Sequence, residues 1–234
     1  FASSPRSDIG VESLGELINA ACAELGGFDL DLAQVLLEPH EHDLARAYRL
    51  GGFERLALLS YLERPLRPKA PPYELDWPMG VEVRAYDPDS MHDDLCRVLD
   101  LSYQETLDCP GLRGKRRTED ILAGHQGTGA FDPDLWTMVY RDGEPIGALL
   151  LNPAPASRSI ELVYIGLAPA ARGLGLGRTV LRYGLELLRN RSEKTLTLAV
   201  DDQNEPAVSL YRSEGFRIVL RRLALIRPLR PITT

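Results

Sequence analysis

The stretch Ala171-Arg-Gly-Leu-Gly-Leu-Gly-Arg178 decides the fold, and it lies between an apolar segment, residues 159–169, and a helical pattern that runs to Asn190. Its glycines at positions 173, 175 and 177 let the backbone approach an anion, because they carry no Cβ atom. Free N–H groups in the first turn of the following helix, together with the helix dipole, favour negative charge there. The pattern matches neither the Walker motif nor the dinucleotide fingerprint. The sequence therefore predicts a phosphate-binding turn, to which Arg172 and Arg178 add cationic groups.

A second motif follows in Asn204-Glu-Pro-Ala-Val-Ser-Leu-Tyr211, with Gly215-Phe216 shortly after it. Hydrophobic periodicity predicts strands over 81–86, 135–141, 145–152, 159–167, 195–200 and 216–226, and helices over 88–106, 118–124, 178–190 and 205–214. Both motifs and this order resemble the GNAT N-acetyltransferase superfamily. The resemblance implies an α/β (α+β) protein with the GNAT acyl-CoA N-acyltransferase fold, a mixed, mostly antiparallel sheet flanked by helices.

An internal repeat is visible at an offset of 163 positions (48 to 211). Tyr48 matches Tyr211, Gly52-Phe53 matches Gly215-Phe216, and Arg64-Pro-Leu-Arg-Pro68 matches Arg227-Pro-Leu-Arg-Pro231. The first copy has lost the phosphate-binding turn, since Ile9, Glu12 and Leu14 stand where the second has Arg172, Gly175 and Gly177. We therefore expect a tandem protein in which the first copy serves as a scaffold.

Three regions follow: residues 1–68 as a partial, degenerate GNAT-like domain, 69–80 as a proline-rich linker, and 81–234 as a complete GNAT acetyltransferase domain. Helices over 13–26 and 41–50 and strands over 30–37 and 56–62 are expected in the first region. It lacks the opening strands of the fold, so we expect its sheet edge to be covered by upstream sequence, the second domain or a second subunit. The tandem arrangement, with the stretch Phe131-Asp-Pro-Asp-Leu-Trp136, is similar to the mycothiol synthase group.

The resemblance implies transfer of an acetyl group from acetyl-CoA to a primary amine, by direct attack in a ternary complex. A non-catalytic acyl-CoA sensor or interaction module of the same fold is the alternative. Tyr211 would be the general acid that protonates the departing thiolate, and Glu161 would be the base. The residues implied in cofactor binding are Ile165, Gly166, Leu167, Arg172, Gly173, Leu174, Gly175, Leu176, Gly177, Arg178, Asn204 and Tyr211.

Each role has a structural alternative. Tyr211 is also suited to the core of an amphipathic helix, as its match at Tyr48 indicates, and Glu161 to solvent or to pairing with a neighbouring strand. Asp201 and Asp202 are alternative bases, although such a pair more often begins a turn. The basic cluster Arg113, Lys115, Arg116 and Arg117 suits an acidic acceptor or the CoA 3′-phosphate, or a solvated loop. The four histidines, His40, His42, His92 and His125, are expected at the surface.

Composition narrows the possible classes of protein and of binding partner further. The 234 residues are 44% hydrophobic, carry a net charge of −7 and contain no run of 18 apolar residues, so we expect a cytoplasmic protein with neither nucleic acid nor membrane as partner. The three cysteines lack metal-ligand spacing, so no metal is expected. The expected partner is a small-molecule or peptide amine, with a homodimer or an intramolecular pseudo-dimer of the repeats. The chain starts at Phe1, which suggests upstream sequence. The acceptor is not readable from spacing.

Overall fold

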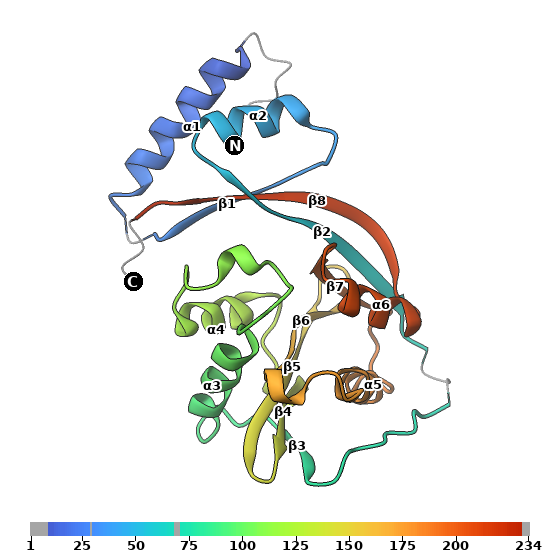
Figure 1. Ribbon diagram of the computed structural model, residues 1–234. Coiled ribbons are helices and arrows are strands. Elements are labelled where there is room, and N and C mark those ends of the chain that lie inside the picture. Colours follow the sequence, from blue (N-terminus) through green and yellow to red (C-terminus); the bar gives the residue numbers. More distant parts are fainter. Residues whose placement is uncertain (1–8, 29, 68–70, 231–234) are drawn as a thin grey trace.

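A single eight-stranded sheet runs through the chain, in the order β1-β8-β2-β7-β6-β5-β4-β3 (Figure 1). The computed structural model describes residues 9–28, 30–67 and 71–230. Linker positions 69 and 70, and the last prolines of the repeated motif, Pro68 and Pro231, lie outside this described part. Neighbouring strands are antiparallel except for β6 and β7, which are parallel. The expected mixed, mostly antiparallel sheet is confirmed.

The elements follow the hydrophobic periods closely. The strands are β1 (Leu32–Leu37), β2 (Glu54–Pro65), β3 (Val81–Ala85), β4 (Trp136–Arg141), β5 (Glu144–Ala154), β6 (Ser159–Leu167), β7 (Thr195–Asp201) and β8 (Arg217–Pro228). The helices are α1 (Val11–Leu25), α2 (His42–Leu50), α3 (His92–Ser102), α4 (Thr118–Gly127), α5 (Leu176–Leu187) and α6 (Glu205–Ser213). The expected hairpin turns at Asp142-Gly143, where both residues have positive φ.

The helix expected over 88–106 is shorter at both ends. Before it, the Asp87 carboxylate accepts the N–H of Asp89 and the hydroxyl of Ser90, which stabilises a turn in place of helix. After it, Glu105 takes a φ of 53°, a left-handed conformation that a helix cannot contain. Side-chain hydrogen bonding and a left-handed residue therefore override the periodicity, and α3 spans His92–Ser102.

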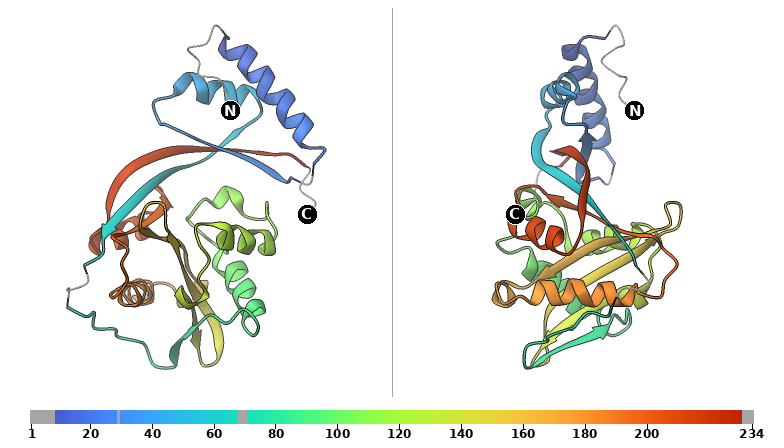
Figure 2. Two further views of the ribbon diagram at one scale, coloured as in Figure 1. Left: turned by 180° about the vertical axis from the view of Figure 1, so that it is seen from behind. Right: turned by 90° about the vertical axis from the view of Figure 1, so that its right-hand side faces the viewer.

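Strand β2 joins the two regions of the chain into one sheet. It pairs with β7 over residues 59–65 and with β8 over residues 54–63. Strand β1 lies at the end of the sheet beside β8, and α1 and α2 cover one face of this part (Figure 1 and Figure 2). The expected covering of the strand edge is met for β2, which has a neighbour on both sides. Strand β1 has no second strand neighbour among the described residues.

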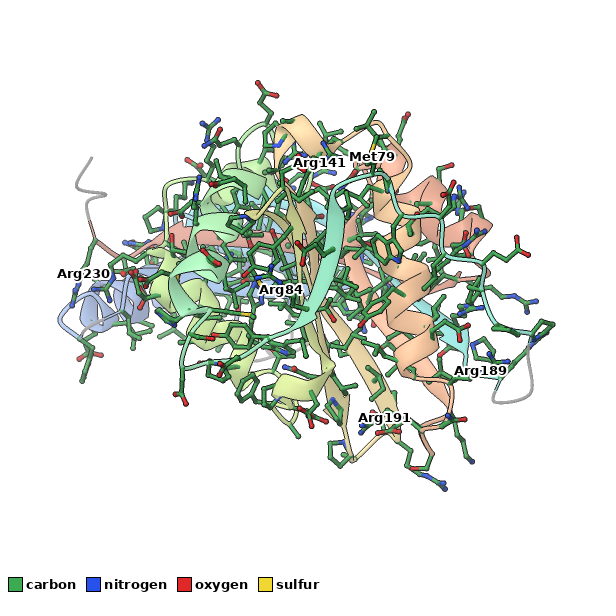
Figure 3. The ribbon with its side chains drawn as sticks, turned by 90° about the horizontal axis from the view of Figure 1, so that it is seen from below. Met79, Arg84, Arg141, Arg189, Arg191 and Arg230 are labelled. Atoms are coloured by element: carbon green, nitrogen blue, oxygen red, sulfur yellow. The ribbon has the colours of Figure 1, made fainter. Side chains whose placement is uncertain are left out.

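Helices cover both faces of the remaining sheet. Helices α5 and α6 pack on one face around Leu149, Ile160 and Leu196, while α3 and α4 pack on the other around Trp136 and Met138. Seen from below, β3 crosses in front of the sheet, with Arg84 on the α3 side (Figure 3). Residues 71–80 form no helix or strand and pack along α5. None of the helices that the structure describes combines the length and apolarity needed to cross a bilayer.

Candidate active site

Strands β6 and β7 separate from one another, and a cavity opens between them. Their parallel pairing is limited to three residue pairs and ends at Glu161 and Thr197. Beyond that point the backbone groups on the β7 side of β6 have no strand partner among the residues that the structure describes. The cavity has a volume of about 1130 Å³ and is lined by β6 from Leu162 to Leu167 and by Ala199 and Val200 of β7. Exposed strand backbone of this kind can hydrogen-bond an extended ligand.

The predicted phosphate-binding turn forms one end of this cavity. Gly173 and Gly175 both have a φ of 77°, which L-amino acids with a side chain rarely adopt. A Cβ atom built on either would meet no atom within 4 Å, so the turn is open toward the cavity. Within the described part of the chain, the N–H groups of residues 173–177 donate to no protein acceptor. Since they precede and begin α5, the turn has free donors and a positive helix dipole where an anion would lie.

The two arginines of the turn both line the cavity, but their guanidinium groups are already engaged. Arg172 donates to backbone carbonyls, among them Leu167 O at 3.0 Å and Ser102 O at 2.6 Å. Arg178 donates to Ser213 and pairs with the buried Glu214 of the chain segment that follows α6. The two guanidinium groups are therefore engaged with protein, whereas the backbone N–H groups of residues 173–177 remain available to a ligand.

Asn204, directly before α6, and Tyr211 of α6 both line the cavity. The Asn204 side chain accepts the N–H of Ala207, which confirms the expected N-cap. Tyr211 packs against Phe216, with ring centroids 5.6 Å apart, and only 5% of its surface is exposed. Burial, and then the charge of Asp108, raise the pKa of the Tyr211 hydroxyl above its ordinary value. The hydroxyl therefore stays protonated and can donate a hydrogen bond near pH 7.

Not all predicted residues meet in this cavity. The cofactor residues named from the sequence line it except for two, since Leu176 is buried in the core and Leu174 points to solvent. Glu161 is half-buried at the last paired position of β6 and is not among the residues, all within the described part, that line the cavity. It lies near Tyr61 of β2, and burial raises the pKa of its carboxyl. Its assignment as base stays a prediction.

The alternative bases on β7 are used in a turn. Asp201 is buried, and its carboxylate accepts the N–H of Gln203, while Asp202 accepts the hydroxyl of Ser60. Asp201 also donates its own N–H to the Asp108 carboxylate at 2.8 Å. These contacts favour the turn interpretation of the aspartate pair over the catalytic one.

Sequence reasoning found only part of a polar wall between α3 and α4, the basic cluster, of which Arg113 and Arg116 line the cavity. Residues 103–117, which we call the α3–α4 segment, contribute Tyr103, Asp108 and Arg116 to the cavity. The Asp108 carboxyl is open to the cavity but has protein on most sides, and this burial raises its pKa. Tyr103 was expected inside the preceding helix and Asp108 in a loop without a period, so these two residues could only be assigned once the loop was placed.

His125 is the clearest correction. It was expected at the surface, yet it lines the cavity and its Nε2 atom is buried without a hydrogen-bond partner in the described part of the chain. Asn152 of β5 fixes the end of α4 by donating to the carbonyls of His125 and Thr128. Burial, and then Arg116, lower the pKa of His125 to about 4, so its ring is neutral near pH 7. Tertiary packing alone turns this histidine inward.

Comparisons with known proteins agree with this arrangement. A family model described as acetyltransferase (GNAT) family matches residues 100–216. A mycothiol acetyltransferase of Thermomonospora curvata is 34% identical over 179 residues, which are 74% of this chain and 57% of the relative. One of Thermobispora bispora is also 34% identical, over 87% of this chain and 67% of the relative. The chain spans little more than half the length of several curated relatives that it matches.

Solved structures share the fold. A GCN5-related N-acetyltransferase of Sphaerobacter thermophilus superposes with a TM-score of 0.63 at 19% identity, over 87% of this chain and 62% of that one. A structure described as a tandem GNAT protein from the clavulanic acid biosynthesis pathway gives 0.57 at 17% identity, over 92% and 70%. At these identities the likeness concerns the fold alone.

Proposed function

Because the chain belongs to the acetyltransferase (GNAT) family, we propose that it transfers an acetyl group from acetyl-CoA to a primary amine. The relatives named mycothiol acetyltransferase lead us to include a mycothiol-type amine as the first acceptor to test. The proposal includes a cytoplasmic location, where acetyl-CoA is available to the enzyme.

The observation that carries the proposal is the open glycine turn at the start of α5. Its two left-handed glycines, the free N–H groups of residues 173–177 and the dipole of α5 suit the pyrophosphate of acetyl-CoA. The unpaired side of β6, at Ile165, Gly166 and Leu167, suits the amides of the pantetheine chain. A ligand held at both places would extend along the cavity toward Tyr211.

Acetyl-CoA supplies a thioester, whose C–S bond breaks as the amine nitrogen forms a C–N bond to the acetyl carbon. Tyr211 then donates its hydroxyl proton to the thiolate sulfur, a role that its protonated hydroxyl and its place in the cavity wall allow. Glu161 accepts the proton that the amine loses, directly or through water. The raised pKa of its carboxyl brings it nearer the operating pH, where a general base is most effective.

The alternative, a non-catalytic acyl-CoA sensor, draws support from the position of Glu161 outside the cavity wall. Tyr211 and Asp108 both face the cavity, however, and supply an acid and a second candidate base. A sensor would need neither group. These two residues are the reason that we prefer the enzyme.

We also propose that residues 1–68 and the closing half of residues 81–234 are two copies that form an intramolecular pseudo-dimer. The bounds of α2 and α6, and those of β2 and β8, differ by 163 at both ends (42 to 205 and 54 to 217). The pairing follows the same rule: Leu32 pairs with Pro228, and their counterparts Thr195 and Pro65 pair with each other. Each copy thereby places its last strand between the strands of the other.

Calorimetric titration with acetyl-CoA tests the proposed function. We expect the wild type to bind at one site, and Gly175→Glu to lose binding because it places a carboxylate in the turn. Ala23→Glu, on the exposed face of α1, adds the same charge elsewhere and should bind as the wild type does. Binding by the wild type justifies a screen of amines, beginning with the mycothiol-type acceptor, by detection of the released thiol. A wild type that does not bind acetyl-CoA would overturn the proposal.

A further inference from the structure

The side chain of Arg172 connects the glycine turn to a different part of the cavity wall. Its Nε donates to Leu167 O at 3.0 Å, at the end of β6. Its two terminal nitrogens donate to Ser102 O at 2.6 Å, Gln104 O at 3.0 Å and Glu105 O at 3.4 Å. A guanidinium has five N–H donors, so these contacts leave about one of them for any ligand.

One of the four carbonyls belongs to Ser102, the last residue of α3, and two belong to Gln104 and Glu105, just beyond the helix. The last carbonyls of a helix have no partner within the helix, and a cation there also interacts favourably with the helix dipole. Arg172 therefore caps α3 from a residue that is 70 positions away along the chain. The connection between β6 and α5 lies beside this end of α3 (Figure 1).

The α3–α4 segment depends on contacts of this kind for its conformation. Glu105 and Cys109 have φ values of 53° and 46°, in a region that costs energy for residues with a Cβ atom. Arg172 binds the first part of the segment, and the N–H of Asp201 binds Asp108 at 2.8 Å. The segment forms the wall of the cavity opposite the strands, with Tyr103, Asp108 and Arg116.

We infer that Arg172 is a positioning residue that couples the acyl-CoA turn to the acceptor side of the cavity, rather than a ligand of the pyrophosphate. The inference rests on the proposed function for its account of what occupies each side. Arg172 directly precedes Gly173, so an anion that fixes the turn also fixes the guanidinium. The guanidinium in turn holds the end of α3 and the start of the α3–α4 segment. Acyl-CoA binding therefore orders the wall against which the amine would lie.

Hydrogen–deuterium exchange of the full chain, with and without acetyl-CoA, tests this coupling alongside calorimetry. In the wild type we expect acetyl-CoA to slow exchange in residues 102–109. In Arg172→Ala and Arg172→Gln we expect that segment to exchange about tenfold faster without ligand and to lose the ligand-dependent slowing. The affinity of both variants for acetyl-CoA should stay within about threefold of the wild type, less than 1 kcal/mol.

Two further variants separate this role from general loss of structure. Arg227→Ala removes a guanidinium that donates to the carbonyl of Gly51, far from the cavity lining, and should leave exchange in residues 102–109 unchanged. Gly175→Glu should show the reverse pattern. It should lose acetyl-CoA binding, while residues 102–109 exchange without ligand at the wild-type rate. With an acceptor in hand, Arg172→Gln should raise the KM for the amine while the KM for acetyl-CoA stays constant.

The inference is overturned if Arg172→Gln loses acetyl-CoA affinity by more than about thirtyfold, about 2 kcal/mol, while residues 102–109 exchange as in the wild type. Arg172 would then be a phosphate ligand. Failure of the proposed function would give a different calorimetric result, because the wild type itself would not bind acetyl-CoA. The ligand-free exchange difference between the wild type and Arg172→Gln still tests the link between Arg172 and α3 in that case.

Discussion

The hydroxyl of Tyr211 is an isolated polar group on a well-packed ring. The ring contacts Phe216, and no described residue accepts or donates a hydrogen bond at the hydroxyl, so Tyr211→Phe removes one oxygen with little loss of packing. If Tyr211 is the general acid, we expect kcat to fall by about 10² to 10⁴ while acetyl-CoA affinity is retained. Steady-state kinetics and calorimetry measure the two quantities.

Tyr48→Phe is the matched control for this variant. Tyr48 lies 163 positions earlier and packs edge-on against Phe53, at a centroid distance of 5.0 Å, but it faces no cavity lined by the glycine turn. Its substitution should leave kcat unchanged. An unaltered kcat in Tyr211→Phe would instead assign Tyr211 to the core, as the repeat suggested from the sequence.

The pKa of Glu161 predicts the pH dependence of the reaction. Burial raises this pKa above 4.5, so the carboxyl is protonated, and inactive as a base, up to a higher pH than an exposed glutamate. We expect kcat/KM to decline as the pH falls through this raised pKa, and Glu161→Gln to lower kcat/KM by about 10² or more and to abolish the decline. Rate measurements between pH 4.5 and 8 would show it.

Asp108 is the group to examine if that prediction fails. A Glu161→Gln variant with the wild-type rate and the same acidic decline would exclude Glu161 as the base. Asp108 faces the cavity, and its pKa is likewise raised by burial. In that case Asp108→Asn should remove the decline instead.

At the scale of elements, α5 approaches β5 so closely that a side chain does not fit. A Cβ atom on Gly184 would lie 2.6 Å from Leu149 Cδ2. Alanine favours helix over glycine by about 1 kcal/mol, but overpacking costs about 1–3 kcal/mol. We therefore expect Gly184→Ala to lower the free energy of unfolding by about 1 kcal/mol, as measured by denaturant titration.

Gly124 provides the comparison within another helix. It lies inside α4, and a Cβ atom there would meet nothing within 4 Å. Gly124→Ala should stabilise the protein by up to about 1 kcal/mol through helix propensity alone. If both variants stabilise the protein equally, the inference that α5 packs too closely on the sheet for a side chain at position 184 is wrong.

Elements were the most predictable level of this protein. The positions of the strands, to within about three residues at each end, and the Asp142-Gly143 hairpin followed from periodicity and turn chemistry, because both depend on residues close in sequence. The ends of α3 did not, since a left-handed Glu105 and a cap supplied by Arg172 are products of distant contacts. The glycine turn was predicted, whereas the engagement of its arginines with protein carbonyls and with Glu214 was not.

At the scale of the molecule, the position of β2 between β7 and β8 makes the two regions interdependent. Among the described residues, β7 and β8 are both paired to β2 and not to each other. A fragment of residues 71–234 would therefore expose one edge of β7 and leave β8 without either of its neighbours, β1 and β2. We expect it to show no cooperative thermal unfolding by circular dichroism, and to regain it when residues 1–67 are co-expressed. A fragment that unfolds cooperatively and binds acetyl-CoA would contradict this.

The sequence by itself determined the family, the order of helices and strands, the glycine turn and Tyr211 of α6 as a residue that faces the cavity, because these depend on local spacing and on the conformational freedom of glycine. Only the tertiary structure decided that β2 lies inside the sheet of the later region, that His125 turns inward, and that Arg172 holds the end of α3. Those outcomes depend on residues as much as 70 to 142 positions apart (172 to 102 and 59 to 201), and on burial, which no local pattern encodes.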